Sequence, residues 1–233
     1  MCERKRGEGL VADAPAFARI FGSTGSKLGL QQPHLQLLPS GSSTEAASAR
    51  ERILNEAAKL FYRDGFVGVG VDTIIAESRV AKMTLYRHFR SKEDLIVAYL
   101  ERADGQFWAW FEKSLGRGNP REQLLQLFES LGEFATSPKC FGGCMFQHAA
   151  ADFPDPDHRA HRVAVEHKMA VLARLADLAQ QAGAGDPREL AAQLLLLMDG
   201  AFVAARMFGT RSPSAQVGTA AAALIKSQVS LNG

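Results

Sequence analysis

Residues 71–89, VDTIIAESRVAKMTLYRHF, decide the fold of this chain. Two short helical patterns lie on either side of a tight joint at Arg79 and Val80, and Gly70 stands where the first pattern begins. The second pattern covers residues 81–87. Two short helices around a tight turn have the spacing of a helix-turn-helix, whose second helix enters the major groove of DNA.

The flanks of this stretch support the same reading. Before it, apolar residues recur every three or four positions between residues 53 and 61, which predicts an amphipathic helix that Gly65 ends. After it, Ser91 followed by Asp94 predicts the capped start of a further helix. Residues 79–92 hold five basic side chains and no acidic one. That local charge suits the phosphates of a nucleic acid.

The rest of the chain also has helical patterns. We expect one helix between Pro120 and Pro138, a turn at 153–156, a long amphipathic helix over about 160–182, an apolar helix over 190–208 and a last helix from Pro213. No strand-like alternation occurs. The sequence predicts an all-α protein of about nine or ten helices, with a flexible arm (1–45), a helix-turn-helix domain (46–95) and a larger helical domain (96–233).

Composition narrows the class of protein. The 233 residues are 46% hydrophobic and 22% charged, which is ordinary for a globular protein, and the net charge of +2 taken alone predicts no partner. Gln193, Asp199 and Arg206 interrupt the most apolar stretch, so we expect no membrane-spanning segment. Three cysteines form no disulfide framework, and with no secretory signal evident we expect a cytoplasmic protein.

The stretch 71–89, the apolar pattern 53–66 before it and the run SKEDL at 91–95 after it together resemble the DNA-binding signature of the TetR family, the tetracycline-repressor-like bacterial regulators. Residues 103–233 resemble the C-terminal domain of one TetR subgroup, chiefly through 107–111 and 142–156. The resemblance implies a homodimeric repressor that binds a palindromic DNA operator and responds to a small molecule.

Carried over by position, the resemblance gives a set of DNA-binding residues: Asp72, Thr73, Lys82, Met83, Thr84, Tyr86, Arg87, His88 and Lys92. Among them, Lys82 can donate to guanine or to a phosphate, and Met83 can contact a thymine methyl. Two positions depart from the family pattern. Arg79 replaces the usual Gly of the joint and Ala81 replaces the usual Ser or Thr cap, each at a cost of about 1 kcal/mol.

The second domain carries two further predictions. An apolar pocket for an apolar or aromatic effector is expected among Trp108, Phe111, Cys144, Phe146, Met198 and Phe202, although each side chain alone is as well explained as core. A dimer interface is expected on the last two helices at Leu194, Leu197, Ala201, Ala204, Ala205, Val217, Ala221 and Leu224. The alternative for these helices is a core within one chain.

Other functions stay open as alternatives. Cys140 and Cys144 are four positions apart, and a thiol sensor of oxidants or electrophiles would use them. A DNA binder without a ligand is a second alternative. Five side chains raise the question of a metal site, although their spacing matches no metal-binding signature and structural roles explain them better: His148, Asp152, His158, His161 and His167. No catalytic motif is present, and we expect neither an enzyme nor a cofactor.

Overall fold

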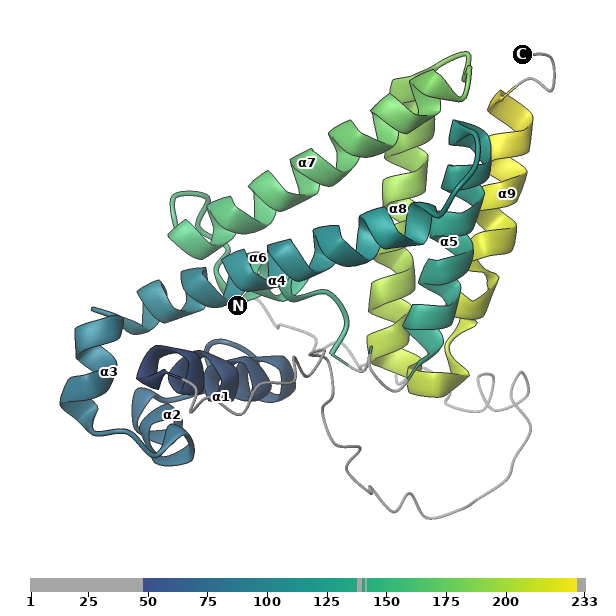
Figure 1. The fold of residues 1–233 in the computed structure, drawn as a ribbon. Helices are drawn as coiled ribbons and strands as arrows, with labels where there is room; N and C mark the ends of the chain where they lie inside the picture. Colours follow the sequence, from purple (N-terminus) through teal and green to yellow (C-terminus); the bar gives the residue numbers. More distant parts are fainter. Residues whose placement is uncertain (1–47, 138–139, 141, 230–233) are drawn as a thin grey trace, which may run out of the picture. The chain divides into compact units, whose positions relative to one another are not determined.

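The computed structural model describes residues 48–137, 140 and 142–229. In this part of the chain all the regular structure is helical, apart from one isolated bridge between Ala184 and Val229 (Figure 1). The all-α prediction is therefore confirmed. The α-helices are α1 (Ala49–Asp64), α2 (Val71–Ser78), α3 (Lys82–His88), α4 (Lys92–Leu115), α5 (Pro120–Thr136), α6 (Met145–Asp152), α7 (Arg159–Gln181), α8 (Pro187–Phe208) and α9 (Val217–Gln228).

Helices α1–α3 and the first turns of α4 form the head of the molecule. The Ser48 side chain caps α1 by accepting from the Glu51 backbone N–H, and Gly65 ends the helix with φ of 77°. The apolar faces meet in a core where Phe61 and Phe66 lie 5.2 Å apart, ring centre to ring centre, and both contact Tyr99 of α4. Aromatic packing therefore fixes the first three helices to the start of α4.

The joint between α2 and α3 has the geometry that the sequence suggests. Arg79 is left-handed (φ 53°, ψ 43°), and Ala81 starts α3 without any side-chain cap. A non-glycine residue in this region carries strain of about 1 kcal/mol. The head therefore keeps a tight helix-turn-helix despite two unfavourable residues, because Ile74, Leu85 and Phe89 anchor it in the core.

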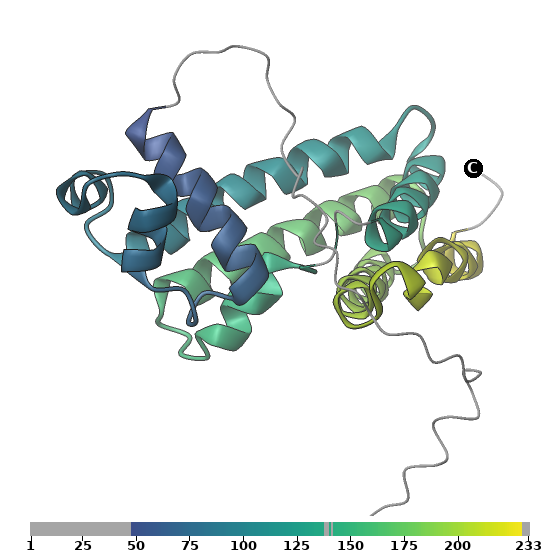
Figure 2. The same ribbon diagram turned by 90° about the horizontal axis from the view of Figure 1, so that it is seen from below.

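The second part of the molecule is a helical bundle. Figures 1 and 2 show α5, α8 and α9 side by side, with α4 and α7 running across toward the head. Asn119 and Glu122 form a capping box at the start of α5, with Pro120 in its first turn. Pro213 begins a 3₁₀ turn, Pro213–Gln216, and the last α-helix starts after it.

Helix α8 is the most apolar element. The stretch Pro187–Arg211 is long and apolar enough, on length and composition, to cross a membrane. In this structure α8 packs against α5, α7 and α9, and the Asp199 side chain in its middle pairs with Lys168 of α7. These contacts give α8 the place of a central helix in the bundle.

Candidate DNA-binding site and regulatory domain

Helix α3 has one buried and one exposed face. Leu85 and Phe89 are 0% and 3% exposed, whereas Met83 is 79% and Tyr86 is 40% exposed. The exposed face of α3 therefore combines an apolar side chain, Met83, with polar and basic ones. Seven of the nine residues expected at DNA are exposed, namely Asp72, Thr73, Lys82, Met83, Tyr86, Arg87 and His88, and the other two, Thr84 and Lys92, are half-buried.

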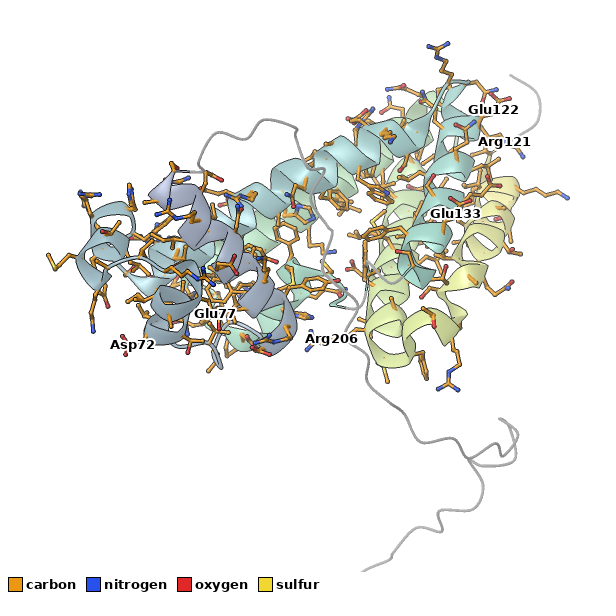
Figure 3. All side chains as sticks on the ribbon, turned by 60° about the horizontal axis from the view of Figure 1, so that its bottom comes forward. Asp72, Glu77, Arg121, Glu122, Glu133 and Arg206 are labelled. Atoms are coloured by element: carbon orange, nitrogen blue, oxygen red, sulfur yellow. The ribbon has the colours of Figure 1, made fainter. Side chains whose placement is uncertain are left out.

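The starts of α2 and α3 are linked by an exposed ion pair. The Lys82 Nζ lies 3.5 Å from the Asp72 Oδ1, and both side chains are mostly in solvent. Asp72 and Glu77 both project from α2 (Figure 3). An exposed pair of this kind contributes little stability. Lys82 is therefore free to exchange the carboxylate for a phosphate or a base.

Lys92 is held differently from the other expected DNA contacts. Its ammonium donates to the Val67 carbonyl at 3.4 Å, across the turn between α1 and α2. Burial lowers the pKa of Lys92, and the nearby charge of Asp152 acts in the opposite direction. The side chain thus has a structural contact within the head as well as a place at the first turn of α4, where Ser91 accepts from the Asp94 N–H at 3.0 Å.

The end of α6, the turn after it and the start of α7 contact the head. Asp152, the last residue of α6, accepts a hydrogen bond from the Phe66 N–H at 2.9 Å, and the Phe153 ring lies 6.0 Å from the Phe66 ring. Arg159 pairs with Asp94 at 2.5 Å. Residues far apart in sequence therefore connect the second domain to both the turn before α2 and the first turn of α4.

A second contact between the two parts lies at Gly142. Its backbone N–H donates to the Tyr62 hydroxyl at 2.6 Å, and a Cβ at this position would stand 2.2 Å from the Tyr62 ring. Burial raises the pKa of Tyr62 to about 12. Glycine is required here because only its backbone can approach the ring so closely.

The side chains of the expected pocket pack against one another and against a histidine. Phe111, Cys144, Phe146, Met198 and Phe202 are buried, and Trp108 is half-buried. The His167 ring stacks on Phe146 at 3.6 Å and meets the edge of Phe107 at 4.7 Å. Two surface hollows, of about 430 and 370 Å³, lie elsewhere, at 173–188 and around Arg90, and neither is lined by the six expected residues.

His167 and Asp104 form a polar centre within this aromatic cluster. The His167 Nδ1 lies 2.6 Å from the Asp104 Oδ1, and the same oxygen accepts from the Trp108 Nε1 at 3.1 Å. Burial lowers the pKa of His167, and the Asp104 hydrogen bond acts against that shift. The two residues come from α4 and α7, so no local spacing in the sequence could have paired them.

The two cysteines near the start of α6 lie in the interior. Cys140 and Cys144 are both free and buried, and burial raises the pKa of the Cys140 thiol to about 12. Because a thiolate is the reactive form, this shift disfavours reaction of Cys140 with an oxidant in the structure as it stands.

The residues considered for a metal have separate partners. His148 contacts Arg206, His158 lies against Phe153, His161 contacts the Phe153 carbonyl and His167 contacts Asp104. In the described residues no group of three or more potential ligands gathers. Each of these histidines therefore has a contact of its own in the described part of the chain.

The predicted dimer residues need a correction. Leu194, Ala201, Ala205, Val217 and Ala221 are 0–6% exposed within one chain, so they have no surface to offer a second subunit. These five positions lie in the core of one chain, because α8 packs against α5, α7 and α9, and α9 packs against α5 as well. Leu197 and Ala204 of α8 and Leu224 of α9 are half-buried.

The exposed apolar face of α8 lies on other residues. Leu196 is 72%, Val203 is 46% and Met207 is 70% exposed, and Gly200 between them is also exposed. Positions 196, 200, 203 and 207 recur at helical spacing and form one stripe, here called the α8 stripe. Sequence periodicity missed it because nearly every position of α8 is apolar.

Comparison with known proteins agrees with both parts of this architecture. The family model "Bacterial regulatory proteins, tetR family" matches residues 53–99, and "Tetracyclin repressor-like, C-terminal domain" matches residues 120–221. The solved structure of SCO4454, a TetR-family transcriptional regulator from Streptomyces coelicolor, is 34% identical, with a TM-score of 0.74 over 78% of this chain and 96% of that chain.

Two further relatives extend the comparison. A TetR transcriptional regulator from Streptomyces avermitilis is 35% identical, with a TM-score of 0.69 over 78% of this chain and 98% of that one. The HTH-type transcriptional regulator YjdC of Escherichia coli is 28% identical over 173 residues, which cover 73% of this chain and 88% of YjdC. With its helix-turn-helix head and its matching second domain, this chain belongs to the TetR family of helix-turn-helix transcriptional regulators.

Proposed function

We propose that this regulator is a cytoplasmic, homodimeric repressor that binds a palindromic operator through α3. The observation that carries the proposal is the outer face of α3, where Lys82, Met83 and Tyr86 stand in solvent on a helix whose other side is locked in the core. Lysine can reach acceptors on guanine, and methionine offers apolar contact to thymine methyls. This combination suits the floor of a major groove better than it suits a solvated surface.

The proposed dimer uses the α8 stripe. Leu196, Val203 and Met207 expose apolar surface on a helix whose opposite side packs against α5, α7 and α9. Burying such a stripe against the same stripe of a second copy is favourable by about 25 cal/mol for each Å² removed from water. Two-fold symmetry then presents two copies of α3 to two half-sites, which accounts for a palindromic operator.

The decisive experiment is a selection of bound fragments from genomic DNA with the purified full chain. We expect recovery of a two-fold symmetric site whose affinity falls as salt rises, because phosphate contacts release counterions. Recovery of fragments with no shared sequence would overturn the proposal.

For the effector, we propose an apolar or aromatic molecule that enters the cluster around His167. The cluster combines aromatic rings with one polar pair, His167 and Asp104, which is the composition of a selective small-molecule site. A ligand would have to displace the stack of His167 on Phe146. Trp108 donates to the same Asp104 oxygen, so ligand entry should change tryptophan fluorescence.

A DNA binder without a ligand is the second candidate. The observation in its favour is the close packing of the expected pocket, in which His167 lies 3.6 Å from the Phe146 ring. A screen of aromatic compounds separates the two. A compound that quenches Trp108 fluorescence and releases the protein from DNA supports the effector. If the protein binds DNA normally and no compound releases it, the second candidate is supported.

A further inference from the structure

Arg79 is an exception to the way this chain builds its left-handed positions. Six other residues of the described part have positive φ, and all six are glycines, which adopt this region without strain. At Arg79 the chain keeps a bulky side chain at φ 53° and ψ 43° instead. Strain of this kind persists where the surroundings impose it, and such positions concentrate at functional sites.

No contact among the described residues accounts for the arginine. Its side chain is exposed, and across the described residues its guanidinium has no hydrogen bond or ion pair. Other arginines of the molecule do have such partners, as Arg102 has in Glu51 and Arg159 in Asp94. The strained backbone at Arg79 is therefore not compensated by a bond that stabilises the head.

Its position on the head suggests what the side chain meets. Arg79 follows α2 directly, and α3 begins three positions later at Lys82, so the side chain leaves the chain at the joint between the two helices. The Lys82 ammonium at the start of α3 lies 3.5 Å from the Asp72 carboxylate of α2. The end of α2 that carries Arg79 thus borders the surface from which α3 approaches DNA.

The charges of α2 give a second argument. Asp72 and Glu77 place two exposed carboxylates on α2 (Figure 3), and that of Asp72 pairs with Lys82, so Glu77 would be the main source of repulsion for a phosphate backbone that passes this helix. Arg79 is the first cation after them along the chain, and a guanidinium can hold a phosphate with two parallel hydrogen bonds. A cation at this point would offset the repulsion between the carboxylates of α2 and a DNA phosphate backbone beside them.

We propose that Arg79 contacts a DNA phosphate beside the groove that α3 enters, and that its left-handed backbone orients the guanidinium toward the strand. This inference rests on the proposed DNA-binding function and adds to it a contact that strengthens binding independently of sequence. The contact comes from the joint of the helix-turn-helix rather than from α3.

The test compares three substitutions at this position in the full chain. Arg79→Gly removes both the charge and the strain, Arg79→Asn removes the charge and tolerates the left-handed region, and Arg79→Lys keeps both charge and strain. Arg188→Gln is the matched control, because Arg188 is also an exposed arginine but lies at the start of α8. Affinity is measured by fluorescence anisotropy with a duplex recovered from the genomic selection and with a scrambled duplex.

We expect Arg79→Gly and Arg79→Asn to melt at or above the temperature of the unchanged protein and yet to bind DNA more weakly. The slope of log affinity against log salt should fall by about 0.9 for each lost phosphate contact, thus by about 1.8 for a dimer. The ratio of the affinity of the unchanged protein to that of Arg79→Gly or Arg79→Asn should fall about tenfold between about 50 and about 200 mM salt. Arg79→Lys and Arg188→Gln should keep the original slope.

Two results would overturn the inference. One is an unchanged slope in Arg79→Gly, and the other is a lower melting temperature, which would assign the side chain a role in the fold. Failure of the proposed function looks different, since the unchanged protein would then show no preference for any selected duplex over its scrambled partner.

Discussion

Met83 is the side chain whose position is hardest to explain without DNA. Its 79% exposure is the largest among the large apolar side chains of the described chain, on a helix of only seven residues. Leu85, two positions later, is fully buried. The pair shows how a short helix divides its apolar residues between the core and a partner.

We predict that Met83→Ala changes the preferred operator sequence without changing stability. An exposed side chain contributes little to folding, whereas a lost methyl contact in the groove weakens binding about 3- to 10-fold at sites with thymine opposite it. Parallel selections with the variant and the unchanged protein measure the effect. Val67→Ala, which removes a 66% exposed apolar side chain from the α1–α2 turn, serves as control and should leave the preference unchanged.

His148 makes stability depend on pH. Burial, helped by the charge of Arg206 and opposed by that of Asp152, lowers its pKa to about 4. The ordinary value of about 6.5 applies to the unfolded chain, which therefore binds more protons between these limits. The contribution of His148 to stability is complete above about pH 6.5 and is lost progressively as the pH falls toward 4.

The corresponding variant is His148→Asn, whose side-chain oxygen can still accept from Arg206. The free energy of unfolding, measured with urea at several pH values from 7 to about 4, should fall less steeply with acid in this variant. A residual slope is expected from His167, whose pKa is also lowered by burial. Parallel pH profiles for the two proteins would count against the assignment.

The short helix α6 ends on a residue that helix electrostatics disfavour. A carboxylate at a C-terminus meets the negative end of the helix dipole. Asp152 stands there because it accepts from the Phe66 N–H in the turn before α2. Helix α6 is therefore less stable at its C-terminus, and in return Asp152 forms a hydrogen bond to the head.

Asp152→Ala should therefore loosen that turn. We expect a loss of about 1.5 kcal/mol in stability, typical of a hydrogen bond to a charged group, and faster amide exchange at residues 65–68. Asp152→Asn keeps an acceptor and should retain most of the protection. Equal exchange in all three proteins would show that Phe66 is held by its ring contacts alone.

Helix boundaries were predictable where single residues mark them. Gly65, Gly70 and Ser91 stand at the ends or starts of helices as their spacing indicated. Helix α6 was not predicted, because eight residues give too few repeats for a period and Cys144 is not a capping residue. The stack of His167 on Phe146 arises from the crossing of α6 and α7, which no spacing along the chain encodes.

The subunit as a whole leaves one side of its bundle uncovered. Leu194 and Leu196 are two positions apart on α8, yet the first is fully buried and the second is 72% exposed. Sequence could not separate them, because both are apolar and only the packing of α5, α7 and α9 decides which side remains open.

The pair gives a matched test of the dimer. Leu196→Glu should yield a folded monomer in analytical ultracentrifugation, whereas Leu194→Ala should lower the free energy of unfolding by about 2–5 kcal/mol through a cavity. Met169→Glu, at a 60% exposed site on α7, controls for added charge and should remain dimeric. A dimer that survives Leu196→Glu would exclude the α8 stripe as its interface.

In the proposed dimer, the α8 stripe would also make the folded protein depend on its own concentration. When a second copy covers Leu196, Val203 and Met207, the stability of the folded chain rises with subunit concentration by mass action. Below the dissociation constant of the dimer, the amount of dimer grows with the square of the total protein. Operator occupancy would then respond to a halving of expression by about a fourfold fall, so repression would end sharply as the regulator is diluted by growth.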